Sequence, residues 1–256
     1  MNELSNFPSV AQGKTSIKFI EELAIVITAK NLTPTMMSQD FLKFSGIIPQ
    51  NWELAQQPVL NPNLAQLTFK HGVSITAQPG TLTMSESVNS KNLNEVSIAQ
   101  IAGQYVAKLP HAEYQVFSLN PKILVPIPDE PTAIKRYFTQ TLLNQGSWQY
   151  IGRGLLQANI NLLYQLERCQ LSISISQATL QAPQQNPLFA VLFSGNFNYG
   201  VASGHQKQTT TQIFQAIQSW QNHLRNIRDI VSQKFLEQET LLQTVPESMI
   251  FPMSTL

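Results

Sequence analysis

The chain has 256 residues, of which 43% are hydrophobic and only 12% are Asp, Glu, Lys or Arg, about half the charged share of an ordinary soluble domain. A net charge of +1 offers no field to attract a polyanion, so we do not expect nucleic acid as a partner. The single cysteine, Cys169, excludes an internal disulfide and any metal site built from several cysteines. Uncharged amides carry much of the polarity instead, since the chain contains 29 glutamines.

Residues 1–15 are polar and irregular, and we interpret them as a lead-in to the folded chain. They lack the basic flank and apolar run of a secretion signal. No apolar stretch anywhere approaches the roughly 20 residues that a membrane-spanning helix needs. We therefore expect a cytoplasmic protein without a membrane span.

The first half, residues 16–128, begins with a strand and a proline-rich segment. Residues 22–30 have an apolar, β-branched centre, which predicts a buried strand. Four prolines between residues 31 and 63 leave room for one short helix over 38–45, with Ser38 as its N-cap. The apolar side of this helix is expected to be Phe41, Leu42 and Phe44.

Residues 64–84 alternate between apolar and polar side chains, interrupted by Gly72 and by a Pro79–Gly80 turn. A period of two predicts antiparallel strands with one face toward water. Asn94 is the predicted N-cap of a helix over 95–109, which Pro110 ends. Further strands are expected at 113–119 and 123–127.

The second half, residues 129–240, follows a similar order. Asp129 and Pro131 predict the start of a helix that reaches Asn144. A hairpin over 160–176, a strand over 188–199 and a long helix over 209–239 follow, and residues 241–256 form an apolar tail. We therefore predict an α+β fold with helices on one face of mainly antiparallel sheet. Whether the two halves are repeats of one α+β unit stays open.

The last predicted helix is amphipathic, with apolar residues at alternating steps of four and three. The seam consists of Ile213, Ile217, Trp220, Leu224, Ile227, Val231 and Phe235. One interpretation is a helix that lies across its own sheet, and the other is a seam that pairs with another chain. The flanking Gln212, Gln218 and Gln221 are neutral, so no charge pattern selects a partner.

No motif predicts a catalytic residue, a metal site or a cofactor. The four histidines have no metal-ligand spacing, and no phosphate-binding loop, dinucleotide fingerprint or nucleophile elbow is present. Arg168 could lower the pKa of the adjacent Cys169, but no histidine base lies near that thiol in sequence.

Two residues are candidate ligand contacts. Arg153 stands between Gly152 and Gly154, where the backbone could approach a carboxylate or phosphate. His205 follows Gly204 just before the last helix, where it could hold an anion or serve as a base. A strand bulge at Arg153 and a flexible polar connection at His205 explain the same residues.

The second half resembles a sporadically distributed prokaryotic family of α+β proteins of about this length, with no assigned activity. The resemblance is carried by the strand end Phe193–Tyr199 (FSGNFNY), the polar break after it and the helix from Ile213 to Phe235. The order of elements from Leu67 to Leu119 is similar to that family's first half. The family often has Asp where this chain has Asn196 and Asn198. The resemblance implies an uncharacterised accessory role and transfers no catalytic residue.

Three functions are compatible with these features. The neutral polar faces, the apolar seam and the apolar tail residues Ile250 and Phe251 favour a non-catalytic binding or assembly module, acting on a protein partner or on a second copy. A small-ligand carrier would need an apolar pocket between sheet and helix. An enzyme would need a site assembled from distant residues.

Overall fold

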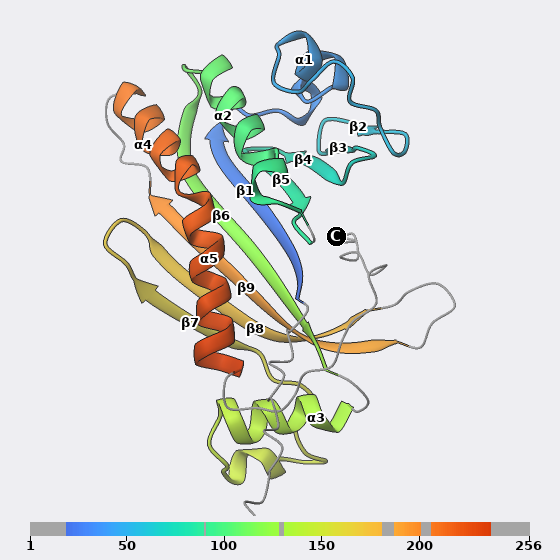
Figure 1. The fold of residues 1–256 in the computed structure, drawn as a ribbon, viewed down its shortest axis with the longest axis vertical. Helices are drawn as coiled ribbons and strands as arrows, with labels where there is room; N and C mark the ends of the chain where they lie inside the picture. The colour runs from blue at the N-terminus through green and yellow to red at the C-terminus, as the bar shows by residue number, and fades with distance from the viewer. Residues whose placement is uncertain (1–18, 90, 128–130, 181–186, 201–205, 237–256) are drawn as a thin grey trace, which may run out of the picture.

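The computed structural model describes residues 19–89, 91–127, 131–180, 187–200 and 206–236. Their strands form one nine-stranded antiparallel sheet in the order β2-β3-β4-β5-β1-β6-β9-β8-β7 (Figure 1). The predicted α+β class with mainly antiparallel sheet is confirmed.

The first half of the chain supplies one side of the sheet. Its elements are β1 (Ile20–Lys30), η1 (Pro34–Met36), α1 (Gln39–Phe44), β2 (Val59–Leu60), β3 (Ala65–Thr68), β4 (Val73–Gln78), β5 (Thr81–Ser87), η2 (Leu93–Glu95) and α2 (Ile98–Lys108). Strand β5 pairs with β1, which closes a meander of β3, β4 and β5 onto the long first strand.

The second half supplies the other side. Its elements are β6 (Glu113–Pro126), α3 (Pro131–Arg136), the π-helix η3 (Tyr137–Leu142), η4 (Ser147–Tyr150), β7 (Ile160–Gln165), β8 (Gln170–Leu180), β9 (Leu188–Gly200), α4 (Gln206–Gln218), α5 (Trp220–Ile230) and the π-helix η5 (Val231–Leu236). Strand β9 pairs with β6, and β6 pairs with β1 from Ile20↔Leu124 to Lys30↔Glu113.

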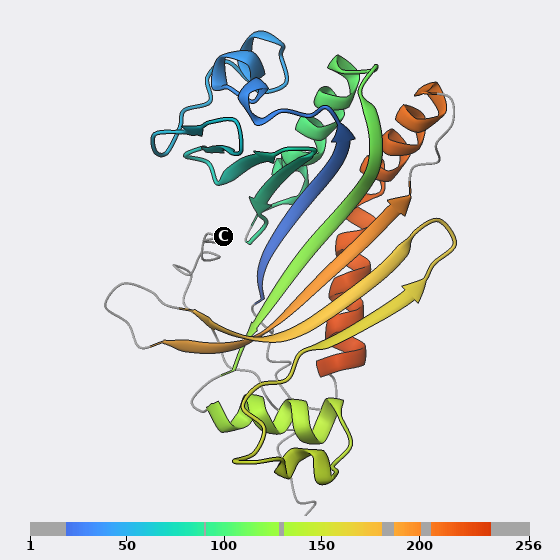
Figure 2. The same ribbon diagram turned by 180° about the vertical axis from the view of Figure 1, so that it is seen from behind.

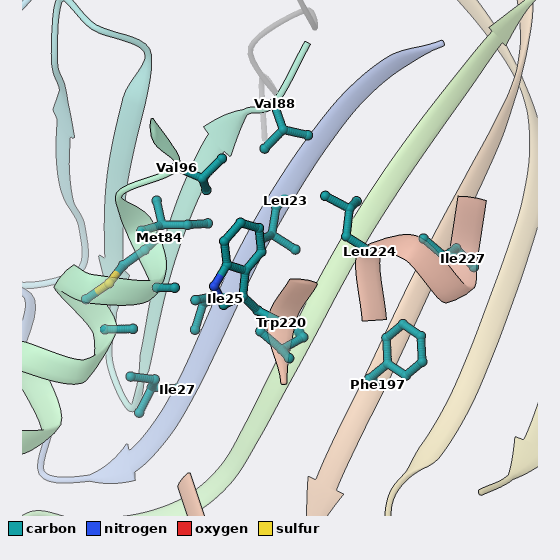
Figure 3. Packing of buried hydrophobic residues seen from close by; sticks show 14 of the residues in the cluster. Leu23, Ile25, Ile27, Met84, Val88, Val96, Phe197, Trp220, Leu224 and Ile227 are labelled. Atoms are coloured by element: carbon teal, nitrogen blue, oxygen red, sulfur yellow. The ribbon is translucent and has the colours of Figure 1, made fainter. Parts of the chain in front are cut away.

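Helices α2, α4 and α5 lie over one face of the sheet (Figure 1). Alternate residues of every central strand point to this side and are buried, as period-two alternation requires. In Figure 3, Trp220, Leu224 and Ile227 of α5 lie among the inward residues of β1, β5 and β9. Gly195 of β9 makes room for α5, because a Cβ there would lie 3.2 Å from Cδ1 of Ile227.

The opposite face has small polar side chains over much of its area and an apolar cluster where Ile20, Leu124, Leu180 and Ala190 are buried. Helices α2, α4 and α5 lie behind the central strands in the view of Figure 2. The alternation assigns to this face Ser74, Thr76, Thr83, Ser85, Ser118, Asn120, Ser172, Ser174, Ser176, Ser194 and Asn196. An ion pair on this face joins Lys122 and Glu22 at 2.9 Å, which are cross-strand partners on β6 and β1. Hydroxyls and amides, with few charges, therefore form the polar part of this face, beside the apolar cluster around Leu124.

Several local predictions are confirmed and others are wrong. Ser38 does cap α1, since its hydroxyl accepts the Phe41 N–H at 3.1 Å. Phe44 is not on the buried side of that helix, because it is 85% exposed. Asn94 is not the cap of α2, because it lies within the short helix η2 and α2 begins at Ile98. The strands predicted at 113–119 and 123–127 are one continuous strand, β6.

A buried carboxylate takes the place of the predicted cap at the start of α2. Glu86 of β5 is 1% exposed and accepts hydrogen bonds from the backbone N–H groups of Ser97 at 2.8 Å and Ile98 at 3.0 Å. The Ser97 hydroxyl also donates to it at 3.2 Å, and Lys91 Nζ lies 2.8 Å from its other oxygen. A carboxylate at a helix N-terminus satisfies free N–H groups and complements the helix dipole.

A second ion pair connects α5 to the sheet. Arg228 donates from Nε and Nη2 to the two carboxylate oxygens of Glu21, at 2.7 and 2.5 Å. Glu21 is 6% exposed, and its backbone N–H donates to the side chain of Asn89. This bidentate geometry fixes the rotation of α5 about its axis as well as its distance from β1.

Glu86→Ala should destabilise the protein by about 3 kcal/mol, because it leaves buried helix N–H groups and a lysine without their acceptor. Glu86→Gln should be less damaging, since one oxygen still accepts. The measurement is urea unfolding followed by circular dichroism. Glu53→Ala is the control, as the exposed Glu53–Lys70 pair should not matter. An unchanged midpoint for Glu86→Ala would contradict the capping role.

Candidate functional site

The apolar seam of the last helix lies in the core of this chain. Six of its seven residues are buried, from Leu224, Ile227 and Val231 at 0% to Trp220 at 8% exposed. Phe235, the seventh, packs on Phe193 of β9 with ring centroids 5.6 Å apart. The helix is also interrupted at Ser219, between α4 and α5. The seam therefore covers the chain's own sheet and is not an exposed surface.

The other predicted contact residues are not brought together by the described structure. Arg153 is exposed in a turn before β7, where Gly152 and Gly154 have φ angles of +59° and +94°. Such angles favour glycine whether or not a ligand is present. His205, Ile250 and Phe251 lie outside the described residues.

The fold brings Cys169, Tyr199 and His223 into one cluster, which the sequence did not predict. Cys169 ends the β7–β8 turn, Tyr199 lies near the end of β9, and His223 is on α5. The Tyr199 hydroxyl is hydrogen-bonded to the Cys169 thiol and to Nε2 of His223. The His223 ring stacks on Phe197 at 4.2 Å, and its Nδ1 is buried without a hydrogen-bond partner among the described residues.

Burial holds this cluster in its uncharged form. It raises the pKa of the Cys169 thiol, an effect that the Tyr199 hydrogen bond opposes. Burial also raises the pKa of Tyr199, and the neighbouring Cys169 adds to the increase. The pKa of His223 is lowered by burial. A thiol with a raised pKa beside a neutral histidine is not an activated nucleophile.

A cavity adjoins the cluster and lies between sheet and helix. This helix–sheet pocket has a volume of about 280 Å³. Its lining comes from β6, the β7–β8 turn, β9, α4 and the α4–α5 junction: Phe117, Arg168, Tyr199, Gly200, Gln212, Ile213, Gln215, Ala216 and Ser219. Arg168, Tyr199 and Ser219 also line a second hollow that reaches Cys169 and His223. Two aromatic rings, neutral amides and one cation could hold a small ligand with an anionic group.

Exposed apolar side chains gather on the chain that leads into and along β7. Of the eleven large hydrophobic residues that are most exposed in the described structure, seven lie between residues 148 and 166. They are Trp148, Tyr150, Ile151, Leu156, Leu163, Tyr164 and Leu166. This segment runs from η4 up the outer edge of the sheet (Figure 1). Exposed apolar side chains are typical of interaction sites, and this segment contains most of the large ones in the described structure.

The hairpin fixes which backbone groups of β7 face outward. The Leu166 N–H donates to the Cys169 carbonyl at 3.0 Å, so residues 166, 164, 162 and 160 share hydrogen bonds with β8. The N–H and C=O groups of Asn161, Leu163 and Gln165 consequently point away from the sheet. We call residues 160–166 the β7 edge. Among the described strands none pairs with its outer side.

Sequence reasoning found the β7–β8 hairpin but not its position at the end of the sheet. Only the strand order reveals that position. The signal that could have suggested an interaction edge is the run from Leu155 to Leu166, which contains no charged residue, proline or glycine. Natural edge strands usually carry such residues as protection against pairing.

Among the residues that the structure describes, no three His, Cys, Asp or Glu side chains are grouped to hold a metal ion. No helix in the described part of the chain is long and apolar enough to cross a membrane. A scan against models of protein families and a search of curated proteins found no match to this sequence. The resemblance to an uncharacterised prokaryotic family thus stays a prediction.

Acid should destabilise the fold. Burial lowers the pKa of His223 and is also the main cause of the lowered pKa of His71. Histidines of the unfolded chain titrate near 6.5, so below about that pH the unfolded state binds more protons. The free energy of unfolding should fall as the pH drops from 7.5 to 5, measured by urea denaturation. The His223→Gln variant should lose less stability than the wild type over this interval. An equal loss in both proteins would contradict a contribution of buried His223 to the acid sensitivity.

Proposed function

We propose that the protein is a non-catalytic binding or assembly module that docks other chains on its β7 edge. The observation that carries the proposal is the coincidence of unpaired backbone groups with exposed apolar side chains, including Leu163 at 69% exposed. Extended segments commonly add to such an edge, with backbone hydrogen bonds providing affinity and side chains providing specificity.

We also propose that the two halves are repeats of one α+β unit, and this comparison supports the role of the edge. Each half has a long strand, a helical segment, a three-stranded meander that returns to the long strand, and a closing helix. In that correspondence β7 is the counterpart of β3.

The edge of β3 is covered by its own chain. Strand β2 pairs with it, the Ala55 N–H donates to the Thr68 carbonyl at 2.8 Å, and Leu54 bridges to Phe69. Trp52 adds an edge-on ring contact with Phe69 at 5.0 Å. Pro58 and Pro62 flank β2 and keep that edge short. In the described second half no comparable segment covers β7, and this difference supports docking of another chain at its edge.

Photo-crosslinking tests the docking surface. A benzophenone side chain at Leu163, introduced in cells of the source organism, should give one discrete adduct, whereas the same group at Phe44 should not. Phe44 is also strongly exposed but lies on α1. Changing Asn161 and Gln165 to Lys should abolish the adduct, because edge lysines oppose strand pairing. No adduct at 163 above the Phe44 control would contradict the proposal.

The helix–sheet pocket supports a second candidate function, a small-ligand carrier. Its position between β6, β9 and α4, with Arg168 beside aromatic walls, suits a compact molecule that has one anionic group. Native mass spectrometry of the purified protein should show a retained mass, and Arg168→Gln should lower its occupancy. A protein that carries no added mass over repeated preparations would exclude this function.

A further inference from the structure

We infer that the occupant of the β7 edge is a second copy of this chain, whose β7 strand pairs antiparallel with the first about a two-fold axis through Leu163. This inference rests on the proposed function and specifies its partner. The two sheets would join into one continuous sheet.

The outward backbone groups restrict the register of such a pair. Asn161, Leu163 and Gln165 each present N–H and C=O groups to the outside, so hydrogen-bonded pairs must be made by these residues. A two-fold axis makes the contact self-complementary. Leu163 is the midpoint of residues 160–166, and only the register centred on it pairs every residue of the β7 edge with its counterpart.

In this register the side chains match on both faces. Leu163 would face its own copy, and the amide of Asn161 would face the amide of Gln165. On the helix side, Leu162 would lie opposite Tyr164, and Ile160 opposite Leu166. Directly opposite apolar pairs stabilise a ladder, and like charges at such positions would oppose it. The β7 edge contains no charged residue, so a second copy meets no repulsion along it.

The composition also favours a second copy over a charged peptide partner. Seven consecutive neutral residues offer no complementary charge by which a basic or acidic strand would be selected. The strand at the opposite end of the sheet, β2, cannot pair with a second copy in this way. It has only two residues, and Pro58 and Pro62 flank it. Pairing of like edges therefore gives a closed dimer and no extended fibre.

Cysteine substitutions test the register. In the inferred dimer the two Leu163 Cα atoms would be about 5.5 Å apart, within the range that a disulfide spans. Leu163→Cys should therefore form a disulfide-linked dimer under mild oxidation. Asn161→Cys is the matched control on the same strand and face, since its two copies would be about 13 Å apart and should stay unlinked. The unsubstituted protein, in which Cys169 is buried, should also stay unlinked.

Light scattering after size exclusion gives the second measurement. The wild-type chain of 28.7 kDa should elute with twice that mass. Leu163→Lys places two like charges at the axis and should raise the dimer dissociation constant about tenfold or more. Phe44→Lys should leave the dimer intact. Because Leu163 is exposed, the Lys variant should have the wild-type thermal midpoint when both proteins are compared at concentrations at which they are monomeric.

The outcomes separate this inference from the proposed function. A monomer at all concentrations, or a dimer that neither Leu163→Lys weakens nor Leu163→Cys links, overturns the two-fold β7 pairing. If the monomer still gives the Leu163 photo-adduct with a different protein, docking at this edge stands and only self-pairing fails. Equal linking by Asn161→Cys and Leu163→Cys would also overturn the register.

Discussion

The ladder between β1 and β6 is the contact on which the rest of the structure depends. Each half builds its meander back onto its own long strand, β5 onto β1 and β9 onto β6. The two halves share one sheet only because β1 and β6 pair along nearly their whole length. Helix α5 spans this junction, with Trp220 among the inward residues of β1 and Ile227 against Gly195 of β9. The Glu21–Arg228 pair joins the same helix to β1. Helix α5 therefore stabilises the junction between the two halves of the sheet, and the sheet fixes the position of α5.

The scarcity of charge is consistent with this architecture. The buried carboxylates are used for structure, since Glu86 caps α2 and Glu21 orients α5. Much of the face opposite the helices is covered with hydroxyls and amides, and the charge on it is paired between Lys122 and Glu22. In the cluster of Cys169, Tyr199 and His223, burial favours the neutral form of each group.

Local periodicity made much of the fold predictable. The alternation through Leu67, Ile75 and Leu82 located buried strand faces because its period matches the pleat, and Ser38 identified a helix start because a cap acts within one turn. The prediction failed where a distant residue replaced the local signal, as at α2, whose N-terminus is satisfied by Glu86 and not by Asn94. The candidate site failed for the same reason. Cys169 and His223 both reach Tyr199 only because β8 pairs with β9 and α5 packs on β9, and no local pattern contains that information.

The two end regions of the sheet differ in how their edges are covered, and core packing alone does not require this difference. A strand at the end of a sheet exposes half of its backbone groups, and unprotected apolar edges invite unwanted pairing. In the first half, the proline-flanked strand β2 and the residues around Trp52 cover the edge of β3, so that β3 is an interior strand. The second half has a similar order of elements but leaves Leu163 and Tyr164 exposed beside unpaired backbone groups. A single lysine would have blocked this edge at little cost to stability, because Leu163 contributes little to the core. The absence of any charge on β7 therefore agrees with the pairing that we propose for this edge, since folding alone does not require it.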